Sequence, residues 1–390
     1  MIAVFLAAVL LLAFICSQIY ARHWYKKLDI LLSFSQSAVY AGNTISFAEQ
    51  IENRKRLPLP ALEVAFWIQK GIVFLDTENI QVSDQVYKRD LFTIFGMESI
   101  LRRYQLDCQK RGHYTISLCT LRTWNLFFSR IRRLELPLTD ELYVYAARTD
   151  VSDILRPLQS LLGEQVSRKR YLEDPFAFAS IREYTPQDPM KTINWKATAR
   201  TGGMMVNTYS SVENEKVMIY LDVGEEYAMR QEELTEESIS VAASLLSVLE
   251  AKGLEVGLSV NVCAQTEKAP DDHADSQSVS AVSAGQEDTP VIFQPGRGRE
   301  FVSRIERFLT QDFSEMKTLP FSSFQPPADD DRICVFISKH QDEDSVKELN
   351  RLTGGRRSGI WVLPVYAYDP LDSLPRVNSQ SLSLVIRKVA

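Results

Sequence analysis

The spacing of apolar residues changes once along the chain, and this change constrains the fold more than any other feature. In the first part, apolar side chains alternate with other residues, as in residues 62–68 and 114–118, and turn pairs such as Gly42-Asn43 separate the runs. Short strands at this spacing predict an antiparallel β-sandwich, of the immunoglobulin-like kind, over residues 31–147.

After residue 211, apolar runs of strand length alternate with helical patterns. The run 216–223 is followed by helical spacing over 239–249, and the same alternation then repeats. Such an order predicts an α/β domain over residues 211–390, with a mainly parallel sheet covered by helices. Within it, residues 264–290 are rich in Ser, Ala, Asp, Gln and Glu, which predicts a mobile insert because they offer little apolar area to bury.

The N-terminus predicts a membrane anchor over residues 1–21. Residues 2–20 carry no charge, and at about 1.5 Å per residue a helix of this length reaches roughly 28 Å, enough to cross a hydrocarbon core. No Lys or Arg precedes the run, which favours an uncleaved transmembrane helix over a signal peptide. The cations that follow are Arg22, His23, Lys26 and Lys27. By the positive-inside rule they predict a single-pass protein of the cell membrane, in contact with lipid, with its soluble head in the cytoplasm.

Composition argues against several functions. The chain has 390 residues, of which 45% are hydrophobic and 24% charged, as expected for a multi-domain globular protein. Its net charge of -6 gives no indication of the basic surface that nucleic-acid binding requires. The five cysteines form no C-x-x-C pair, the four histidines are scattered, and no phosphate loop or nucleophile elbow occurs. An enzyme is therefore disfavoured.

A polar segment links the two patterned halves and forms a signature region over residues 150–210. Its central part lacks the apolar stripe of a core helix. Arg182 and Arg200 each carry a planar guanidinium group with several N–H donors. The carboxylate of Asp188 can accept hydrogen bonds from such a group with both of its oxygens. One interpretation is a polar clasp between domains, which we favour because structural ion-pair networks also concentrate charge. The alternative is an envelope-associated hydrolase or transferase that uses Asp188 with Tyr184 or Lys196.

The order Arg-x-Tyr, then Asp, then Ile-x-Trp-Lys-Ala-x-Ala-Arg resembles the signature of the bacterial family called domain of unknown function 58. The residues that carry the resemblance are Arg182, Tyr184, Asp188, Ile193, Trp195, Lys196, Ala197, Ala199 and Arg200. Gln187 stands where the family usually has Gly before the Asp. We take the candidate interaction site to be Arg182, Tyr184, Asp188, Asn194, Trp195, Lys196 and Arg200.

The resemblance also implies a fold and a partner. The C-terminal half of the family resembles the von Willebrand factor A domain, whose metal site begins Asp-x-Ser-x-Ser. In this sequence Gly224 and Glu226 replace the two serines after Asp222, and Ser338 follows a later strand where a further ligand would lie. Since Mg²⁺ needs several fixed oxygen ligands, Asp222, Glu226 and Ser338 form at best a degenerate site, and no cofactor is expected. Alternatively, Asp222 caps a loop or pairs with a signature cation such as Arg200.

The function that we expect is that of a membrane-anchored interaction or scaffold protein. The resemblance implies a MoxR-type AAA+ ATPase as its partner, in assembly or chaperone-like tasks. Two alternatives remain at this point: the hydrolase or transferase, and a structural scaffold whose sandwich binds envelope components outside the cell.

Overall fold

The chain forms two compact units in a computed structural model. The first comprises Met1–Arg148 and Glu306–Asp312, and the second Thr149–Ile305 and Phe313–Ala390. The structure describes residues 2–75, 80–82, 85–124, 131–170, 178–186, 188, 190–209, 215–224, 231–263, 289–326, 332–341, 343–353, 359–369 and 382–389. Most of the predicted insert, residues 264–288, lies outside these ranges, as does Glu226.

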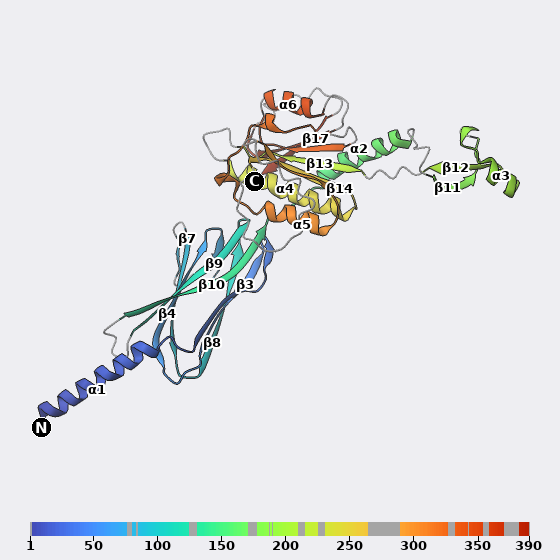
Figure 1. Ribbon diagram of the computed structural model, residues 1–390. Helices are drawn as coiled ribbons and strands as arrows, with labels where there is room; N and C mark the ends of the chain where they lie inside the picture. The colour runs from blue at the N-terminus through green and yellow to red at the C-terminus, as the bar shows by residue number, and fades with distance from the viewer. Residues whose placement is uncertain are drawn as a thin grey trace. The chain divides into compact units, whose positions relative to one another are not determined.

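Helix α1, Ile2–His23, opens the first unit and ends against a β-sandwich (Figure 1). Tyr20 in its last turn is fully buried, and its hydroxyl lies 3.3 Å from Oγ1 of Thr123. Trp24, just beyond the helix, is buried in the same core. Among the residues that the structure describes, no helix combines the length and the apolar character needed to cross a membrane.

Among the described residues of the first unit, ten strands form two sheets, of four strands in the order β1-β3-β8-β5 and of six in the order β2-β10-β9-β4-β7-β6. The strands are β1 Leu28–Phe34, β2 Ala38–Tyr40, β3 Thr44–Asn53, β4 Leu59–Gln69, β5 Ile72–Phe74, β6 Ile80–Val82, β7 Gln85–Ile94, β8 Glu98–Cys108, β9 Gly112–Trp124 and β10 Ile131–Tyr145. All neighbouring pairs are antiparallel except β2 with β10. The antiparallel sheets predicted for this half are thus confirmed.

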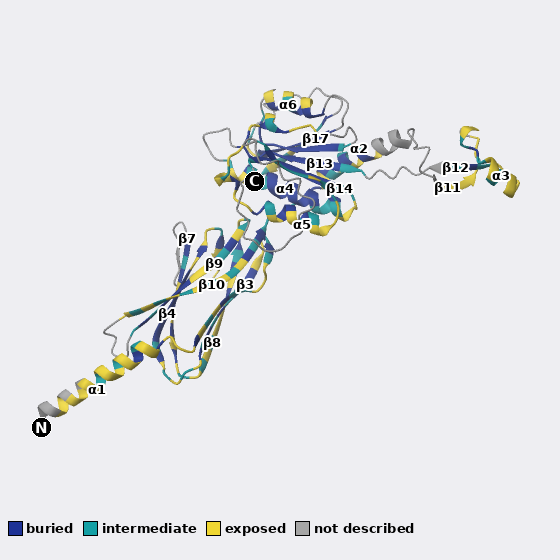
Figure 2. Ribbon diagram, in the orientation of Figure 1, coloured by how far each residue is buried: buried dark blue, intermediate teal, exposed yellow. Residues whose placement is uncertain are grey.

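The period-2 pattern explains how the two sheets pack. Along β3 every second side chain is buried, which places Phe47 and Ile51 in the core (Figure 2). Phe66 of the six-stranded sheet meets Phe47 with ring centroids 5.3 Å apart. The two inner faces therefore share one hydrophobic core.

The second unit is built on a six-stranded sheet in the order β15-β14-β13-β16-β17-β18. Its strands are β13 Lys216–Leu221, β14 Glu255–Cys263, β15 Pro290–Gly296, β16 Arg332–Ile337, β17 Gly359–Tyr366 and β18 Leu382–Val389. All neighbours are parallel except β14 and β15, so the mainly parallel sheet is confirmed. The antiparallel edge strand β15 was not predicted. The central strands are buried along nearly their whole length, as expected for a sheet covered on both faces.

Helices cover this sheet on both faces (Figure 1). The helices are α2 Ser152–Arg170, α4 Glu232–Ala251, α5 Arg299–Phe308 and α6 Glu343–Thr353. α6 packs Leu349 and Leu352 against Phe336 and Trp361 of one face, while α4 contacts β13, β14 and β17 from the other. α2 continues to Arg170 and contains Pro157 in its interior.

A small hairpin carries the signature residues. It consists of β11 Phe178–Glu183, the single turn η1 Met190–Thr192, α3 Trp195–Thr201 and β12 Met205–Tyr209. β11 and β12 pair antiparallel, and Ile193 forms an isolated bridge to Val206. We call these four elements the signature hairpin.

Candidate functional site

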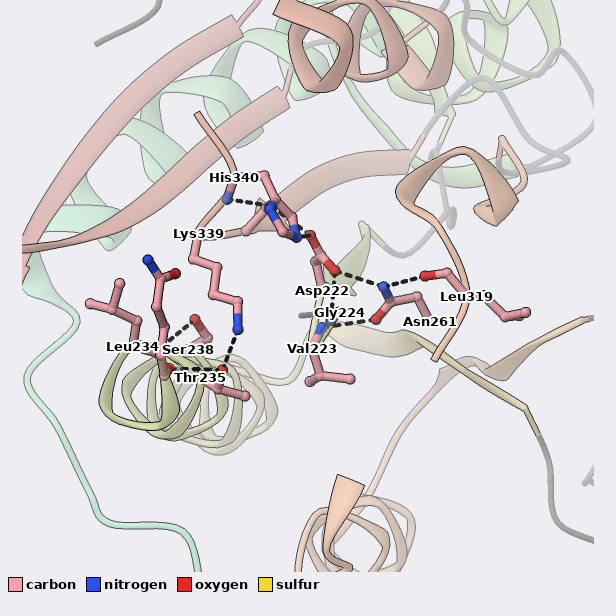
Figure 3. Close-up of polar contacts among 12 residues, drawn as sticks. Asp222, Val223, Gly224, Leu234, Thr235, Ser238, Asn261, Leu319, Lys339 and His340 are labelled. Atoms are coloured by element: carbon pink, nitrogen blue, oxygen red, sulfur yellow. Dashed lines mark hydrogen bonds and ion pairs between the residues drawn. The ribbon is translucent and has the colours of Figure 1, made fainter. Parts of the chain in front are cut away.

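Polar side chains gather at the carboxyl ends of the central strands of the parallel sheet. The strand order reverses between β13 and β16, because the chain first runs outward to β15 and then returns to β16. Asp222 follows β13 and Ser338 follows β16, so both lie at this reversal, where ligands bind in open parallel sheets. Asn261 of β14 and His340 complete the group, which we call the strand-end cluster (Figure 3).

The carboxylate of Asp222 is surrounded by donors. Its Oδ1 accepts from the backbone N–H of Gly224 at 3.0 Å and from Nδ2 of Asn261 at 2.6 Å. Its Oδ2 accepts from Oγ of Ser338 at 2.7 Å and lies 3.3 Å from Nε2 of His340. Asp222 is 1% exposed, so these contacts replace water around a buried acid.

The partners of Asp222 are themselves held by the sheet and its connections. Nδ2 of Asn261 also donates to the carbonyl of Leu319 at 2.9 Å, and its Oδ1 accepts from the N–H of Val223 at 2.8 Å. Oγ of Ser338 accepts from the N–H of His340 at 3.2 Å. The cluster therefore ties the ends of β13, β14 and β16 together.

The described residues do not fit a metal ion at Asp222. Each carboxylate oxygen already has two protein neighbours, and a Mg²⁺ ion would have to displace them. Ser338 directs its hydroxyl at Asp222, and Glu226 lies outside the described residues. Among those that are described, no group of three His, Cys, Asp or Glu side chains has metal-binding geometry. Asp222 caps the loop that follows β13, since the N–H of Gly224 donates to it, and the neighbours of its carboxylate are Asn261, Ser338 and His340 and not Arg200.

The signature hairpin contains a second satisfied carboxylate, that of Asp188. Arg182 donates to it with both guanidinium nitrogens, Nη1 at 2.8 Å and Nη2 at 2.6 Å. The N–H and the hydroxyl of Thr185 each donate to Oδ2 at 2.8 Å. The hydrogen bonds from Arg182, followed by those from Thr185, hold the pKa of Asp188 well below its usual range. The carboxylate therefore closes the turn and is a poor proton acceptor.

Asn194 and Gly202 explain why α3 begins and ends where it does. Oδ1 of Asn194 accepts from the N–H of Ala197 at 2.9 Å and caps the helix, while its Nδ2 donates to Oδ1 of Asn207 at 2.7 Å. Gly202 adopts a left-handed φ of 74° after the last turn. Thr198 accepts from the N–H of Met205 at 3.0 Å, so the helix is fixed to β12.

The surface of the signature hairpin is apolar and basic. Trp195 is 69% exposed and Met190 is 71% exposed, whereas Ile193 and Val206 are buried, so the hairpin has both exposed and buried residues (Figure 2). Lys191, Lys196 and Arg200 are exposed, and Tyr184 is half-buried. The structure thus brings Arg182 and Asp188 together, as the sequence suggested, and leaves Trp195, Lys196 and Arg200 facing solvent.

Two residues of the strand-end cluster, Asn261 and His340, and the neighbouring Lys339 were missed by sequence reasoning. Asn261 interrupts the apolar strand β14, and a polar side chain inside a buried parallel strand was the available signal. Lys339 and His340 follow Ser338 and are both almost fully buried. Nζ of Lys339 donates to Oγ1 of Thr235 at 2.7 Å. No pattern in the sequence distinguishes these two residues from an exposed loop.

Comparison with known proteins bears on the signature. Residues 180–291 match the model of a family described as "Protein of unknown function DUF58". This part of the chain belongs to the DUF58 family. The DUF58 match covers the signature hairpin from Ser180 onward and includes Asp222 and Asn261, whereas Ser338 and His340 lie beyond it.

A curated relative supports the DUF58 assignment. The chain is 22% identical over 224 residues to the uncharacterized protein YeaD of Bacillus subtilis (strain 168). The alignment covers 57% of this chain and 53% of YeaD, so the chain spans about half the length of this relative.

Two solved structures that resemble part of this chain each align with about a third of it. A non-cellulosomal cohesin from Archaeoglobus fulgidus has a TM-score of 0.23 and 11% identity, and covers 31% of this chain and 92% of the cohesin. A cohesin from scaffoldin B of Acetivibrio cellulolyticus has a TM-score of 0.22 and 8% identity, and covers 30% of this chain and 98% of that chain. Similarities this weak establish no function.

Proposed function

We propose that this DUF58 protein is a membrane-attached interaction protein that docks to a partner through the signature hairpin. The observation that carries the proposal is the exposure of Trp195 and Met190, 69% and 71%, on a module whose polar groups are internally hydrogen-bonded. Exposing a large aromatic side chain to water has an unfavourable free energy, and here a hydrogen-bonded framework holds that side chain outward. It is well suited to fill a pocket on another protein.

The composition of this surface resembles the centre of protein interfaces. Trp and Arg are the residues whose removal most often weakens a complex, and Trp195 and Arg200 lie on the same short helix. Lys191 and Lys196 add positive charge around them, which suits an acidic partner. The hydrolase or transferase alternative gains no support, since the acceptor positions of Asp188 are engaged by Arg182 and Thr185.

The partner that the family suggests is a MoxR-type AAA+ ATPase, in an assembly or chaperone-like task. In this proposal the second unit is a von Willebrand factor A-like domain without a functional metal site. The strand-end cluster would then have a structural role, since Asn261 and Ser338 donate to Asp222 where a metal would otherwise bind. The immunoglobulin-like sandwich of the first unit would connect the anchor to the head.

Attachment to the membrane is assigned to α1. Its large apolar side chains point into solvent, with Phe5 71% and Leu12 63% exposed. A helix with such a surface needs an apolar environment. The exposed cations Arg22, Lys26 and Lys27 follow the helix, and they favour a cytoplasmic head.

The docking role is tested by binding of the full-length chain, in detergent, to a purified MoxR-type ATPase from the same organism. Trp195→Ala is expected to raise the Kd about thirtyfold, the effect of losing about 2 kcal/mol at an interface hot spot. Trp67→Ala is the matched control, because Trp67 is 47% exposed on the sandwich, and it should leave the Kd unchanged. Absence of any complex at micromolar concentrations would refute this partner.

Membrane attachment is tested separately by carbonate extraction of cell membranes. The full chain is expected to remain in the pellet, and a Leu11→Lys, Leu12→Lys variant is expected to move to the supernatant. Protease treatment of intact cells and inverted vesicles then locates the head. Digestion in intact cells would contradict the cytoplasmic assignment.

A further inference from the structure

Three segments meet at the end of the β-sandwich where α1 arrives, and we call this end the basic tip. It consists of residues 22–27, 54–57 and 95–97. The N–H of Arg54 donates to the carbonyl of Lys27 at 2.9 Å, and the N–H of Met97 donates to the carbonyl of Lys55 at 3.0 Å. The three segments are thus linked by backbone hydrogen bonds within the first unit.

The fully buried Asn53 holds two of these segments in place. Its Nδ2 donates to the carbonyl of Leu57 at 3.0 Å and to that of Phe95 at 2.8 Å, and its Oδ1 accepts from Nζ of Lys55 at 2.8 Å. Gly96 lies so close that an added Cβ would come within 2.4 Å of the carbonyl oxygen of Arg56. The backbone of the tip is therefore fixed, and its outward side chains are presented from a rigid base.

These outward side chains are apolar. Phe95 is 66% exposed, Met97 is 70% exposed, and Tyr25 is 45% exposed beside the buried Trp24. Met97 also has a φ of 63°, a left-handed conformation in which Gly or Asn is normally favoured. A long apolar side chain in a strained backbone position, facing water, gives the isolated unit no stability. Its presence indicates a function in contact with something else.

The tip is also positively charged in a chain whose net charge is -6. Arg54 is neutralised by Asp29 at 3.3 Å and Glu52 at 2.8 Å. Lys26, Lys27 and Arg56 are exposed, and no ion pair is found for them in the described part of the chain. Aromatic and apolar side chains combined with unpaired cations are the composition of surfaces that lie at the headgroup level of an anionic bilayer.

We propose that the basic tip lies against the anionic headgroups of a lipid bilayer, with Phe95 and Met97 inserted between them. This inference rests on the proposed attachment of α1 to a membrane, because α1 enters the sandwich at this same end through Tyr20 and Trp24 (Figure 1). Contact at the tip would give the sandwich a fixed orientation on the membrane, which a single helix does not provide.

The test uses the full-length chain in lipid nanodiscs, with a photo-crosslinking benzoylphenylalanine at position 95 or 97. Mass spectrometry then identifies what is attached. The control places the same group at Val73, which is 42% exposed and pairs with Asp107, nine residues from Glu98 along β8 and therefore about 30 Å from the tip. Lipid adducts are expected at 95 and 97, absent at 73, and stronger in discs that contain phosphatidylglycerol than in phosphatidylcholine alone.

Two sets of variants sharpen the result. Replacing Lys26, Lys27 and Arg56 by Gln should lower adduct formation in anionic discs about fivefold per cation, whereas Arg103→Gln on an exposed stretch of β8 should not. With the crosslinker at 95, Met97→Gly should reduce adducts while leaving the sandwich folded, since Gly accepts the left-handed backbone.

The failures are distinguishable. A chain that stays in the discs but gives no lipid adduct at 95 or 97 overturns the tip contact and leaves the anchor intact. A chain that does not stay in the discs overturns both. Adducts with protein at these positions would show a docking surface for another chain and would likewise overturn the lipid contact.

Discussion

Two buried acids, one in each unit, are accommodated in opposite ways. Asp222 of the α/β unit has donors on both oxygens. Glu49 of the sandwich is fully buried on β3, yet its Oε1 has no hydrogen-bond partner among the described residues. Burial, and next the charge of Asp90, raise the pKa of Glu49 to about 8. One acid is thus fully hydrogen-bonded by its neighbours, and the other is kept protonated by its burial.

The surroundings of Glu49 agree with a protonated acid. The hydroxyl of Tyr104 lies 3.0 Å from Oδ2 of Asp90 and 3.2 Å from Oε2 of Glu49. A hydroxyl has one proton to donate, so it can serve one carboxylate as donor and must accept from the other. Nζ of Lys88 is 3.4 Å from Oδ2 of Asp90, so the cation lies beside Asp90, and the raised pKa of Glu49 leaves the proton on Glu49. A buried acid with a complete set of donors links the strand ends, whereas a buried acid with an incomplete set leaves a titrating group in the core.

The largest expected effect comes from breaking the complete set. Asp222→Ala leaves the amide of Asn261, the hydroxyl of Ser338 and the N–H of Gly224 buried without their acceptor. We expect the free energy of unfolding of the α/β unit to fall by about 3–5 kcal/mol. Hydrogen exchange of peptides from β13 and β16, measured on the full chain under denaturant, reports this unit separately.

An exposed acid in the same unit provides the control. The side chain of Asp344 is 85% exposed and pairs with Lys347 at 2.7 Å. Asp344→Ala should therefore leave the free energy of unfolding of the α/β unit unchanged within error. Equal effects of Asp222→Ala and Asp344→Ala would show that the strand-end cluster does not hold the strands together.

A smaller effect, and one that depends on pH, is expected at Glu49. Because the folded chain keeps a proton that the unfolded chain releases above a pKa near 4.5, stability is greatest below that pH and falls as pH rises toward about 8. Glu49→Gln removes this titration. At pH 8 the variant should exceed the parent in free energy of unfolding by roughly 2–4 kcal/mol, and near pH 4.5 the two should converge.

Glu52→Gln on the same strand is the matched variant for this measurement. The hydrogen bond with Arg54 lowers the pKa of Glu52, so Glu52 titrates below pH 4.5. The change in the free energy of unfolding between pH 4.5 and 8 should therefore be the same in Glu52→Gln as in the parent. Hydrogen exchange of peptides from β3 and β8 follows the sandwich. A parent chain whose sandwich is equally stable at pH 5 and pH 8 would contradict the protonated state of Glu49.

The same contrast shows what sequence reasoning can reach. The alternation along β3 and the apolar runs of β13 and β16 are local patterns, so they predicted the two kinds of sheet. The pair of Arg182 and Asp188 was within reach as well, because the two residues are six positions apart. The partners of Asp222 were not, since Asn261 and Ser338 are 39 and 116 residues away and the strand order alone brings them together.

The burial of charged side chains in the sandwich could not be predicted from the sequence for a related reason. Glu49, Lys88 and Asp90 occupy inward positions of β3 and β7, where the alternation by itself predicts apolar residues. From the sequence alone such residues indicate exposure. Their burial depends on how strands from two sheets face each other, which local pattern does not encode.

The smallest predicted effect compares two buried serines of the parallel sheet. Ser338 and Ser259 are each 1% exposed, but Ser338 donates to Asp222 at 2.7 Å, whereas Oγ of Ser259 has no hydrogen-bond partner in the described structure. Ser338→Ala should therefore lower the free energy of unfolding by about 2 kcal/mol, the usual contribution of a hydrogen bond to a charged group. Ser259→Ala should change it by no more than about 0.5 kcal/mol, since it removes a hydroxyl that gains nothing from burial. Equal losses for the two variants would mean that volume, and not the bond to Asp222, sets the stability of these strand ends.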